Sequence, residues 1–184
     1  MSLTSNQQAQ LLQLARQSIT QGLSTGQPVA PPATTDPDLL RPGASFVTLT
    51  KDGQLRGCIG TLEARQPLQA DVCENAFNAA FRDFRFPPLQ ADELPQVQVE
   101  VSVLSAPEDL DCESEAELLQ ALVPGEDGLI IAEGQHRATF LPQVWEQLPQ
   151  PAQFVQQLKA KAGLPQNYWS PRLRVQRYRV QKFI

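Results

Sequence analysis

A cysteine lies between two glycines in the stretch Leu55 to Gly60, which reads Leu-Arg-Gly-Cys-Ile-Gly. A thiolate is a competent nucleophile, and a nearby cation favours the ionised form of a thiol. If the stretch is a strand, Arg56 is such a cation, because residues i and i+2 share a face. Glycines inside a strand indicate a bulge or the close approach of a ligand or another element. We therefore expect a cleft here, with Cys58 as candidate nucleophile, Arg56 as its helper, and Gly57 and Gly60 as candidate ligand-binding positions.

Other interpretations of this stretch remain open. Gly57, Cys58 and Gly60 could be small because a helix packs tightly on the strand, or they could line a pocket that binds without covalent chemistry. The sequence alone does not decide whether the protein is an enzyme. Further candidates are Asp83, Arg85 and His136 for orientation or proton transfer, and Glu100 for ligand binding.

A hairpin is predicted to position the cysteine. The strand Phe46–Thr50 leads through Asp52-Gly53, a dipeptide typical of a tight turn between strands, to a second strand over Leu55–Leu62. Alternation places Arg56, Cys58 and Gly60 on one face of that second strand.

Helices and strands follow on both sides of the hairpin. A capping box at Ser5 and Gln8 predicts a helix that ends at Gly22, and a proline-rich loop follows over 27–43, pinned by Leu39 and Leu40. The remaining predicted elements are a helix from Pro67 whose apolar stripe includes a buried Cys73 and Phe84, a strand over 97–103, a helix after Ser114, a hairpin over 128–141, helices beginning at Pro142 and Pro151, and a basic strand over 173–183. Hairpins dominate and no regular βαβ repeat is present, which predicts an α+β fold with a mostly antiparallel sheet.

Composition limits the functional classes. The 184 residues suffice for one sizeable core or two small subdomains, and 41% hydrophobic with 19% charged residues is ordinary for a globular protein. No apolar run approaches the roughly 20 residues of a membrane helix, and the first residues lack the pattern of a signal peptide, so we expect a cytoplasmic protein without a membrane partner. Three cysteines without a C-x-x-C pair and one histidine predict no bound metal, and we expect no cofactor.

The charge is unevenly distributed along the chain. The net charge is −5; residues 86–136 hold twelve acidic and no basic residues, whereas 159–184 hold seven basic and no acidic residues. Such asymmetry can mark a nucleic-acid-binding face, with Arg174, Arg177 and Arg179 as candidates. The interpretation we favour is two charged faces that complement each other within one fold.

Several separated segments of the chain form a recognisable combination: Phe46–Leu49, Leu55–Gly60, Asp83–Pro88, Val101–Leu104, Gly125–Ile131, Ala138–Val144 and Lys161–Leu164 before Trp169. Together they resemble the AMMECR family, which is named for the Alport-syndrome and elliptocytosis chromosomal region. The resemblance covers roughly residues 10 to 184 and is most specific in the six-residue cysteine motif. Phe84 departs from the family pattern, which often has a smaller residue or a proline there.

The resemblance implies one AMMECR domain over residues 1–184, with two subdomains built around one sheet. Prokaryotic members resemble protein A of the AmmeMemoRadiSam system, where they accompany a radical S-adenosylmethionine protein and a Memo protein similar to extradiol dioxygenases. The resemblance therefore suggests an enzyme or enzyme subunit that acts with such proteins. It supplies no substrate or reaction.

Overall fold

A computed structural model describes residues 2–184 and divides the chain into two compact units. Unit 1 extends to Leu104 and includes the last residues, Gln181–Ile184, whereas unit 2 is Ser105–Val180. The Cys58 motif belongs to unit 1. Each unit has helices and a hydrophobic core of its own.

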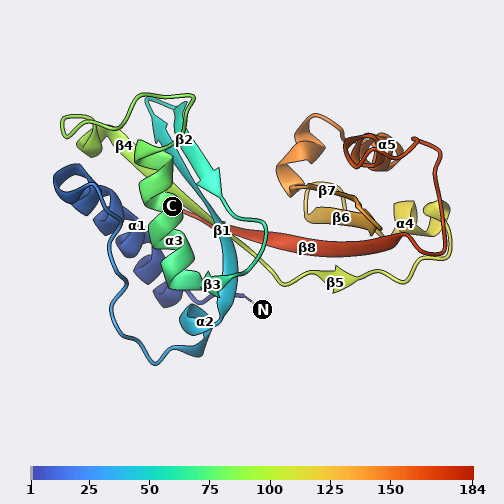
Figure 1. Ribbon diagram of the computed structural model, residues 1–184, viewed down its shortest axis with the longest axis horizontal. Coiled ribbons are helices and arrows are strands. Elements are labelled where there is room, and N and C mark those ends of the chain that lie inside the picture. The colour runs from blue at the N-terminus through green and yellow to red at the C-terminus, as the bar shows by residue number, and fades with distance from the viewer. Residues whose placement is uncertain (1) are drawn as a thin grey trace. The chain divides into compact units, whose positions relative to one another are not determined.

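Unit 1 is built on an antiparallel sheet in which β1 lies between β2 and β4 (Figure 1). Its elements are α1 (Ser5–Thr25), α2 (Pro37–Leu40), β1 (Pro42–Lys51), β2 (Gln54–Gly60), β3 (Gln66–Pro67), α3 (Leu68–Phe81), the short 3-10 helix η1 (Leu94–Gln96) and β4 (Val97–Leu104). The predicted hairpin is confirmed as β1 and β2. Asp52 and Gly53 form its turn with φ values of 52° and 74°, the positive values that primed turns need.

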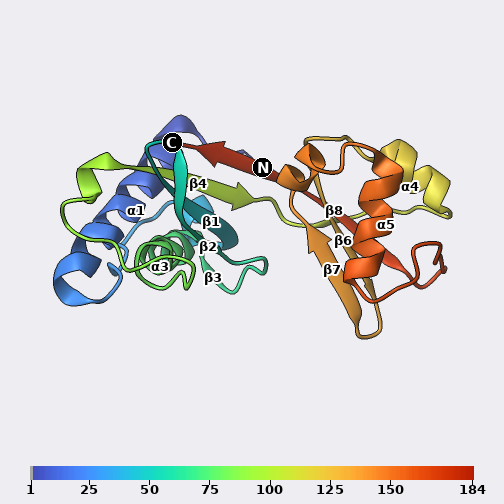
Figure 2. The ribbon, with the colours of Figure 1, turned by 90° about the horizontal axis from the view of Figure 1, so that it is seen from above.

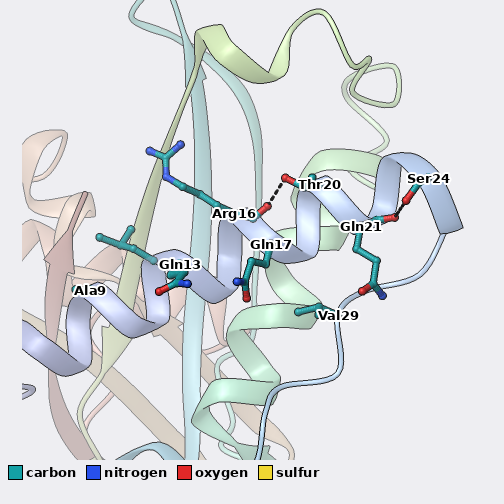
Figure 3. A pocket seen from close by; sticks show the side chains of 9 residues that line it. Ala9, Gln13, Arg16, Gln17, Thr20, Gln21, Ser24 and Val29 are labelled. Carbon is teal, nitrogen blue, oxygen red and sulfur yellow. Dashed lines mark hydrogen bonds between the residues drawn. The ribbon is translucent and has the colours of Figure 1, made fainter.

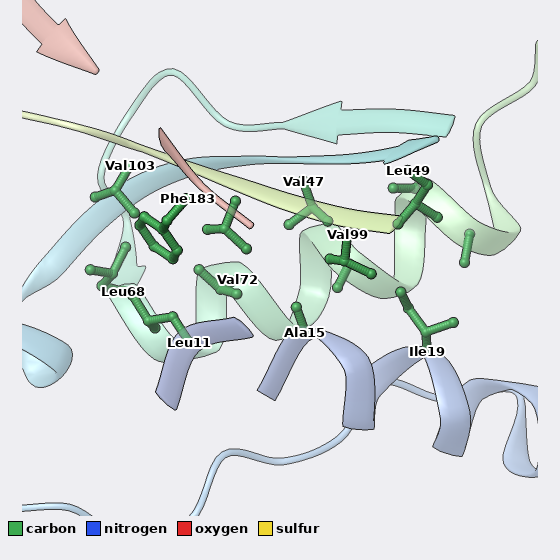
Figure 4. Packing of buried hydrophobic residues seen from close by; sticks show 14 of the residues in the cluster. Leu11, Ala15, Ile19, Val47, Leu49, Leu68, Val72, Val99, Val103 and Phe183 are labelled. Carbon is green, nitrogen blue, oxygen red and sulfur yellow. The ribbon is translucent and has the colours of Figure 1, made fainter. Parts of the chain in front are cut away.

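The two long helices cover one face of this sheet. Val47 and Leu49 of β1 are fully buried and, with the valines of β4, point toward α1 and α3 (Figure 4). Because side chains alternate along a strand, Thr48 points to the opposite face. Among the described residues of unit 1, that second face is not part of the helix-covered core.

The ends of α1 differ from the prediction. The capping box consists of Thr4 and Gln7, and the helix ends at Gly26 in the left-handed conformation. Gly22, the predicted stop, lies inside the helix, where a Cβ would overlap the rings of Phe81 and Phe77. Its small size therefore serves the packing of α1 on α3.

α3 is shorter than its apolar stripe suggested. The helix ends at Phe81, and the Phe84 side chain is 94% exposed, so the prediction that Phe84 belongs to the buried stripe is wrong. Cys73 is 1% exposed, which confirms that it is a core residue. In the proline-rich segment Leu39 is buried as predicted, whereas Leu40 is exposed.

In unit 2, β6 lies between β7 and β8 and β5 pairs with β8, all antiparallel, and these strands belong to the same eight-stranded sheet as β1, β2 and β4. The elements of unit 2 are β5 (Glu108–Asp109), α4 (Glu115–Ala121), β6 (Asp127–Glu133), β7 (His136–Phe140), the 3-10 helix η2 (Pro142–Glu146), α5 (Pro151–Lys161) and β8 (Arg174–Phe183), whose last residues belong to unit 1. The α5 helix lies across this sheet (Figure 2), and the stacked rings of Phe154 and Trp145 pack in the core between them.

These elements confirm the predicted α+β class with antiparallel pairing. Within residues 2–184, no helix is both long enough and apolar enough to cross a membrane.

Candidate functional site

Cys58 lies on the face of the unit 1 sheet opposite the long helices. It is half-buried and pairs across the hairpin with Thr48, and Thr48 pairs in turn with Glu100 of β4. The Cys58 Sγ is 3.3 Å from the Thr48 Oγ1, within hydrogen-bonding distance. The three side chains therefore form a row across three strands.

A β-bulge breaks the alternation of β2 at Arg56. Leu49 faces Gly57, but Thr50 faces Leu55, so Arg56 has no partner on β1. A bulge turns its extra residue away from the expected face. The prediction that Arg56 shares a face with Cys58 is therefore wrong.

The Arg56 side chain forms an ion pair on the helix side of the sheet. Its Nε and Nη2 donate to the two oxygens of Glu93, at 3.0 Å and 2.8 Å, and the Lys51 Nζ lies 3.3 Å from the same carboxylate. Lys51 alternates with Leu49 and so projects to the helix side. The hydrogen bonds from Arg56 are the main reason that the pKa of Glu93 falls from 4.5 to about 2.

Asp83 and Arg85 hold the backbone of Cys58. The Cys58 amide donates to the Asp83 Oδ2 at 2.9 Å, and the Arg85 Nη2 donates to the Cys58 carbonyl at 3.2 Å. Arg85 also pairs with both oxygens of Asp83, at 2.9 Å and 2.7 Å. The fold thus brings Asp83 and Arg85 to Cys58, where they contact the peptide groups of Cys58 rather than its sulfur.

This arrangement strongly favours the charged forms of both side chains. Hydrogen bonds from Arg85 first, and then from the amides of Cys58 and Arg85, hold the pKa of Asp83 far below its usual range although burial opposes them. The pKa of Arg85 is raised, mainly by Asp83 and to a smaller extent by the charge of Cys58. Arg85, and not Arg56, is therefore the cation that lies beside the Cys58 peptide.

The two glycines of the motif are required by packing. A Cβ on Gly57 would overlap the backbone oxygen of Ala79 in α3, and one on Gly60 would overlap the ring of Phe46. The packing interpretation therefore holds for Gly57, where a helix is the neighbour, and for Gly60, where a side chain is. The Cys58 side chain projects from the other face, so α3 is not the neighbour that it packs against.

Glu100 follows Cys58 and Thr48 as the third residue of the polar row. Its Oε1 lies 4.0 Å from the Nζ of Lys182, and both side chains are partly exposed. The row on this face thus carries a thiol, a hydroxyl, a carboxylate and an ammonium group in that order.

His136 belongs to unit 2, whereas Cys58 belongs to unit 1. Its Nδ1 lies 2.9 Å from the carbonyl oxygen of Ala162. Because a carbonyl only accepts, Nδ1 is the nitrogen that carries the proton in this hydrogen bond. The ring borders a shallow hollow of about 470 Å³ with Glu133 and Arg172, which are 3.4 Å apart.

A larger hollow of about 890 Å³ runs along the outer side of α1 and ends at Val29 (Figure 3). Its lining is mostly glutamine and hydroxyl side chains, with Arg16 as its charged group. None of the candidate catalytic residues lines it, and its neutral amides are unsuited to acid–base or nucleophilic chemistry.

The other two cysteines lie in surroundings that oppose ionisation. Burial raises the pKa of Cys73 to about 12, and burial followed by the charges of Glu117 and Asp111 raises that of Cys112. Among residues 2–184, no three histidine, cysteine, aspartate or glutamate side chains gather as metal ligands.

The three arginines of the basic strand face carboxylates within unit 2. Arg174 lies 2.9 Å from Asp109, and Arg179 lies 3.4 Å from both Glu126 and Asp127. Arg177 lies 3.9 Å from Glu108 and 3.9 Å from Asp127. This geometry agrees with charged segments that complement each other within the fold.

Two residues that matter at this site were missed in the sequence. A two-residue turn without a bulge would place Thr48 opposite Gly57, and the bulge moves its partner to Cys58. Glu93, the partner of Arg56, lies 37 residues further along the chain. No local pattern marks such a distant pair.

Comparisons with known proteins agree on one family. The AMMECR1 family model matches residues 12–183. A protein from Methanothermobacter thermautotrophicus is 43% identical over 150 residues, covering 80% of this chain and 78% of the relative, and one from Thermofilum pendens is 36% identical over 99% of this chain and 91% of the relative. The crystal structure of the uncharacterized protein PH0010 from Pyrococcus horikoshii is similar with a TM-score of 0.77 and 34% identity, covering 94% of this chain and 88% of that one. The chain belongs to the AMMECR1 family.

Proposed function

We propose that unit 1 carries a thiol-dependent active site at Cys58, so that the protein acts as an enzyme or an enzyme subunit. One observation carries the proposal: the Cys58 side chain projects from the sheet face opposite the helices, beside Thr48, while Asp83 and Arg85 fix its backbone. A thiol held in a fixed peptide with a cation nearby has the features of a reactive cysteine. Glu100 and Lys182 extend the polar surface on which a substrate would lie.

Alkylation rates test this proposal. At pH 7, limiting iodoacetamide followed by peptide mass spectrometry should modify Cys58 before Cys112, and Cys73 only after unfolding, because burial raises the pKa of Cys73 to about 12. Cys58→Ser provides the control for the assignment and should keep the thermal stability of the wild type. Labelling of Cys58 no faster than that of Cys112 would contradict the proposal.

Protein partners form a second part of the proposal, and their support is the family resemblance alone. The chain would act with a Memo-like protein and a radical S-adenosylmethionine protein. Purified samples of the three, mixed and separated by size exclusion, should show a complex. Separate elution of all three proteins would remove this part without affecting the role of Cys58.

The alternative is a non-catalytic module that binds nucleic acid or protein through Arg174, Arg177 and Arg179. It has less support, because each of these guanidinium groups already has a carboxylate within 4 Å. Nucleic-acid affinity depends on positive charge that is free to replace counterions at phosphates.

A further inference from the structure

Thr48 is the neighbour of Cys58 whose hydroxyl reaches the sulfur. The Cys58 N–H and C=O point to Asp83 and Arg85, away from β1, so Cys58 and Thr48 form a non-hydrogen-bonded pair. In such pairs the facing side chains lie closest together. The 3.3 Å between Oγ1 and Sγ follows from this register, which the bulge at Arg56 creates.

The direction of this hydrogen bond is decided by the state of the thiol. A hydroxyl rotates freely and can donate or accept, whereas a thiolate only accepts. Within residues 2–184, the Thr48 Oγ1 makes no other side-chain hydrogen bond, so its proton is available to the sulfur.

The hydrogen bonds of the two nearby arginines go to groups other than the sulfur. The Nε and Nη2 of Arg85 donate to Asp83 and to the Cys58 carbonyl, and those of Arg56 donate to Glu93. Thr48 supplies the direct hydrogen bond that unit 1 offers to the sulfur.

We propose that Thr48 is a catalytic residue of the Cys58 site, whose hydroxyl donates a hydrogen bond to the thiolate and so keeps it available for attack. The inference rests on the proposed function. Unit 1 contains no histidine, since the one histidine of the chain is in unit 2. In the proposed step the thiol first gives its proton to solvent, and the thiolate then attacks.

This chemistry points to a class of substrate. Without a general acid beside the sulfur, the leaving group must depart as a stable anion, and a thiolate does so readily. The fitting substrates are disulfides or thioesters. The thiolate electron pair forms the new bond to sulfur or to the acyl carbon, and the bond to the leaving sulfur breaks with its electron pair on that sulfur.

The pH dependence of disulfide exchange tests the role of Thr48. The probe is the chromogenic disulfide dithiobis-nitrobenzoate, in a background with Cys73 and Cys112 changed to serine. Thr48→Val keeps the shape of the side chain but removes the hydroxyl, and should slow the reaction at pH 7 about tenfold and move the midpoint of the rate–pH curve upward by about one unit. Thr48→Ser should restore the rate. Thr50→Val, on the same face of β1, should match the wild type.

The outcomes separate this inference from the proposed function. If Cys58 reacts rapidly in the wild type and equally rapidly in Thr48→Val, the role of Thr48 is overturned and the proposed function stands. A wild-type Cys58 no faster than a cysteine in the unfolded chain would overturn both. Should the background with Cys73 and Cys112 changed to serine not fold, the single variants at Thr48 are compared by peptide mass spectrometry with the same expected ratios.

Discussion

Replacing Glu93 with glutamine removes the charge that holds Arg56 on the helix side of β2. The Arg56 side chain is 11% exposed and that of Glu93 16%, so water screens their interaction only partly. One Arg56 nitrogen, Nη1, is buried without a hydrogen-bond partner, and loss of the carboxylate would leave the whole group without its counter-charge. We therefore expect Glu93→Gln to destabilise unit 1 substantially.

The size of the effect follows from linkage. The pKa of Glu93 is lowered from 4.5 to about 2, which corresponds to about 3 kcal/mol in the free energy of unfolding. Because the folded carboxyl has the lower pKa, the unfolded chain binds more protons as pH falls. The stabilisation is complete at pH 7 and is lost as pH falls from about 5 toward 2.

Urea unfolding followed by circular dichroism measures this difference. Wild type should exceed Glu93→Gln by about 3 kcal/mol at pH 7, and the gap should close as pH approaches 2. Glu63→Gln is the matched control, because the Glu63–Arg65 pair is exposed and should contribute under about 0.5 kcal/mol. A gap below that of the control, or one that does not change with pH, would refute the reasoning.

Two further predictions follow from the packing and the charges. Gly57→Ala should lower the free energy of unfolding by about 3 kcal/mol, because the added Cβ would meet the backbone of α3. In Gly53→Ala the added Cβ meets no atom within 4 Å, so the loss should be about 1 kcal/mol, caused by the φ of +74°. Equal losses of the two variants in urea unfolding would contradict this contrast. Wild type should show no salt-sensitive retention of single-stranded DNA in a mobility assay, and retention that disappears when Arg174, Arg177 and Arg179 are all changed to alanine would instead support the basic-face alternative.

Local signals predicted the hairpin, whereas distant contacts decided its details. Asp52-Gly53 sets the turn because both residues adopt positive φ, a property readable from two adjacent residues. The residue at the bulge, Arg56, pairs with Glu93, which lies on a different segment. Sequence patterns therefore found the strand that carries Cys58 but assigned Arg56 to the wrong face of it.

The helices also show that local patterns predict some features while distant contacts decide others. The apolar period of α3 predicted a buried Cys73 correctly, since burial follows from spacing along one helix. The same period could not show that the helix ends at Phe81, beyond which Asp83 and Arg85 turn to the Cys58 peptide. Phe84, between those two anchors, is consequently directed into solvent instead of the core.

Three residues of the cysteine motif are each fixed by a different contact. Gly57 is small because of a backbone oxygen of α3, Gly60 because of the Phe46 ring, and Arg56 is held by Glu93. Cys58 is the motif residue whose side chain serves none of these contacts, although two charged residues fix its peptide. The packing of the motif is thus explained without the sulfur.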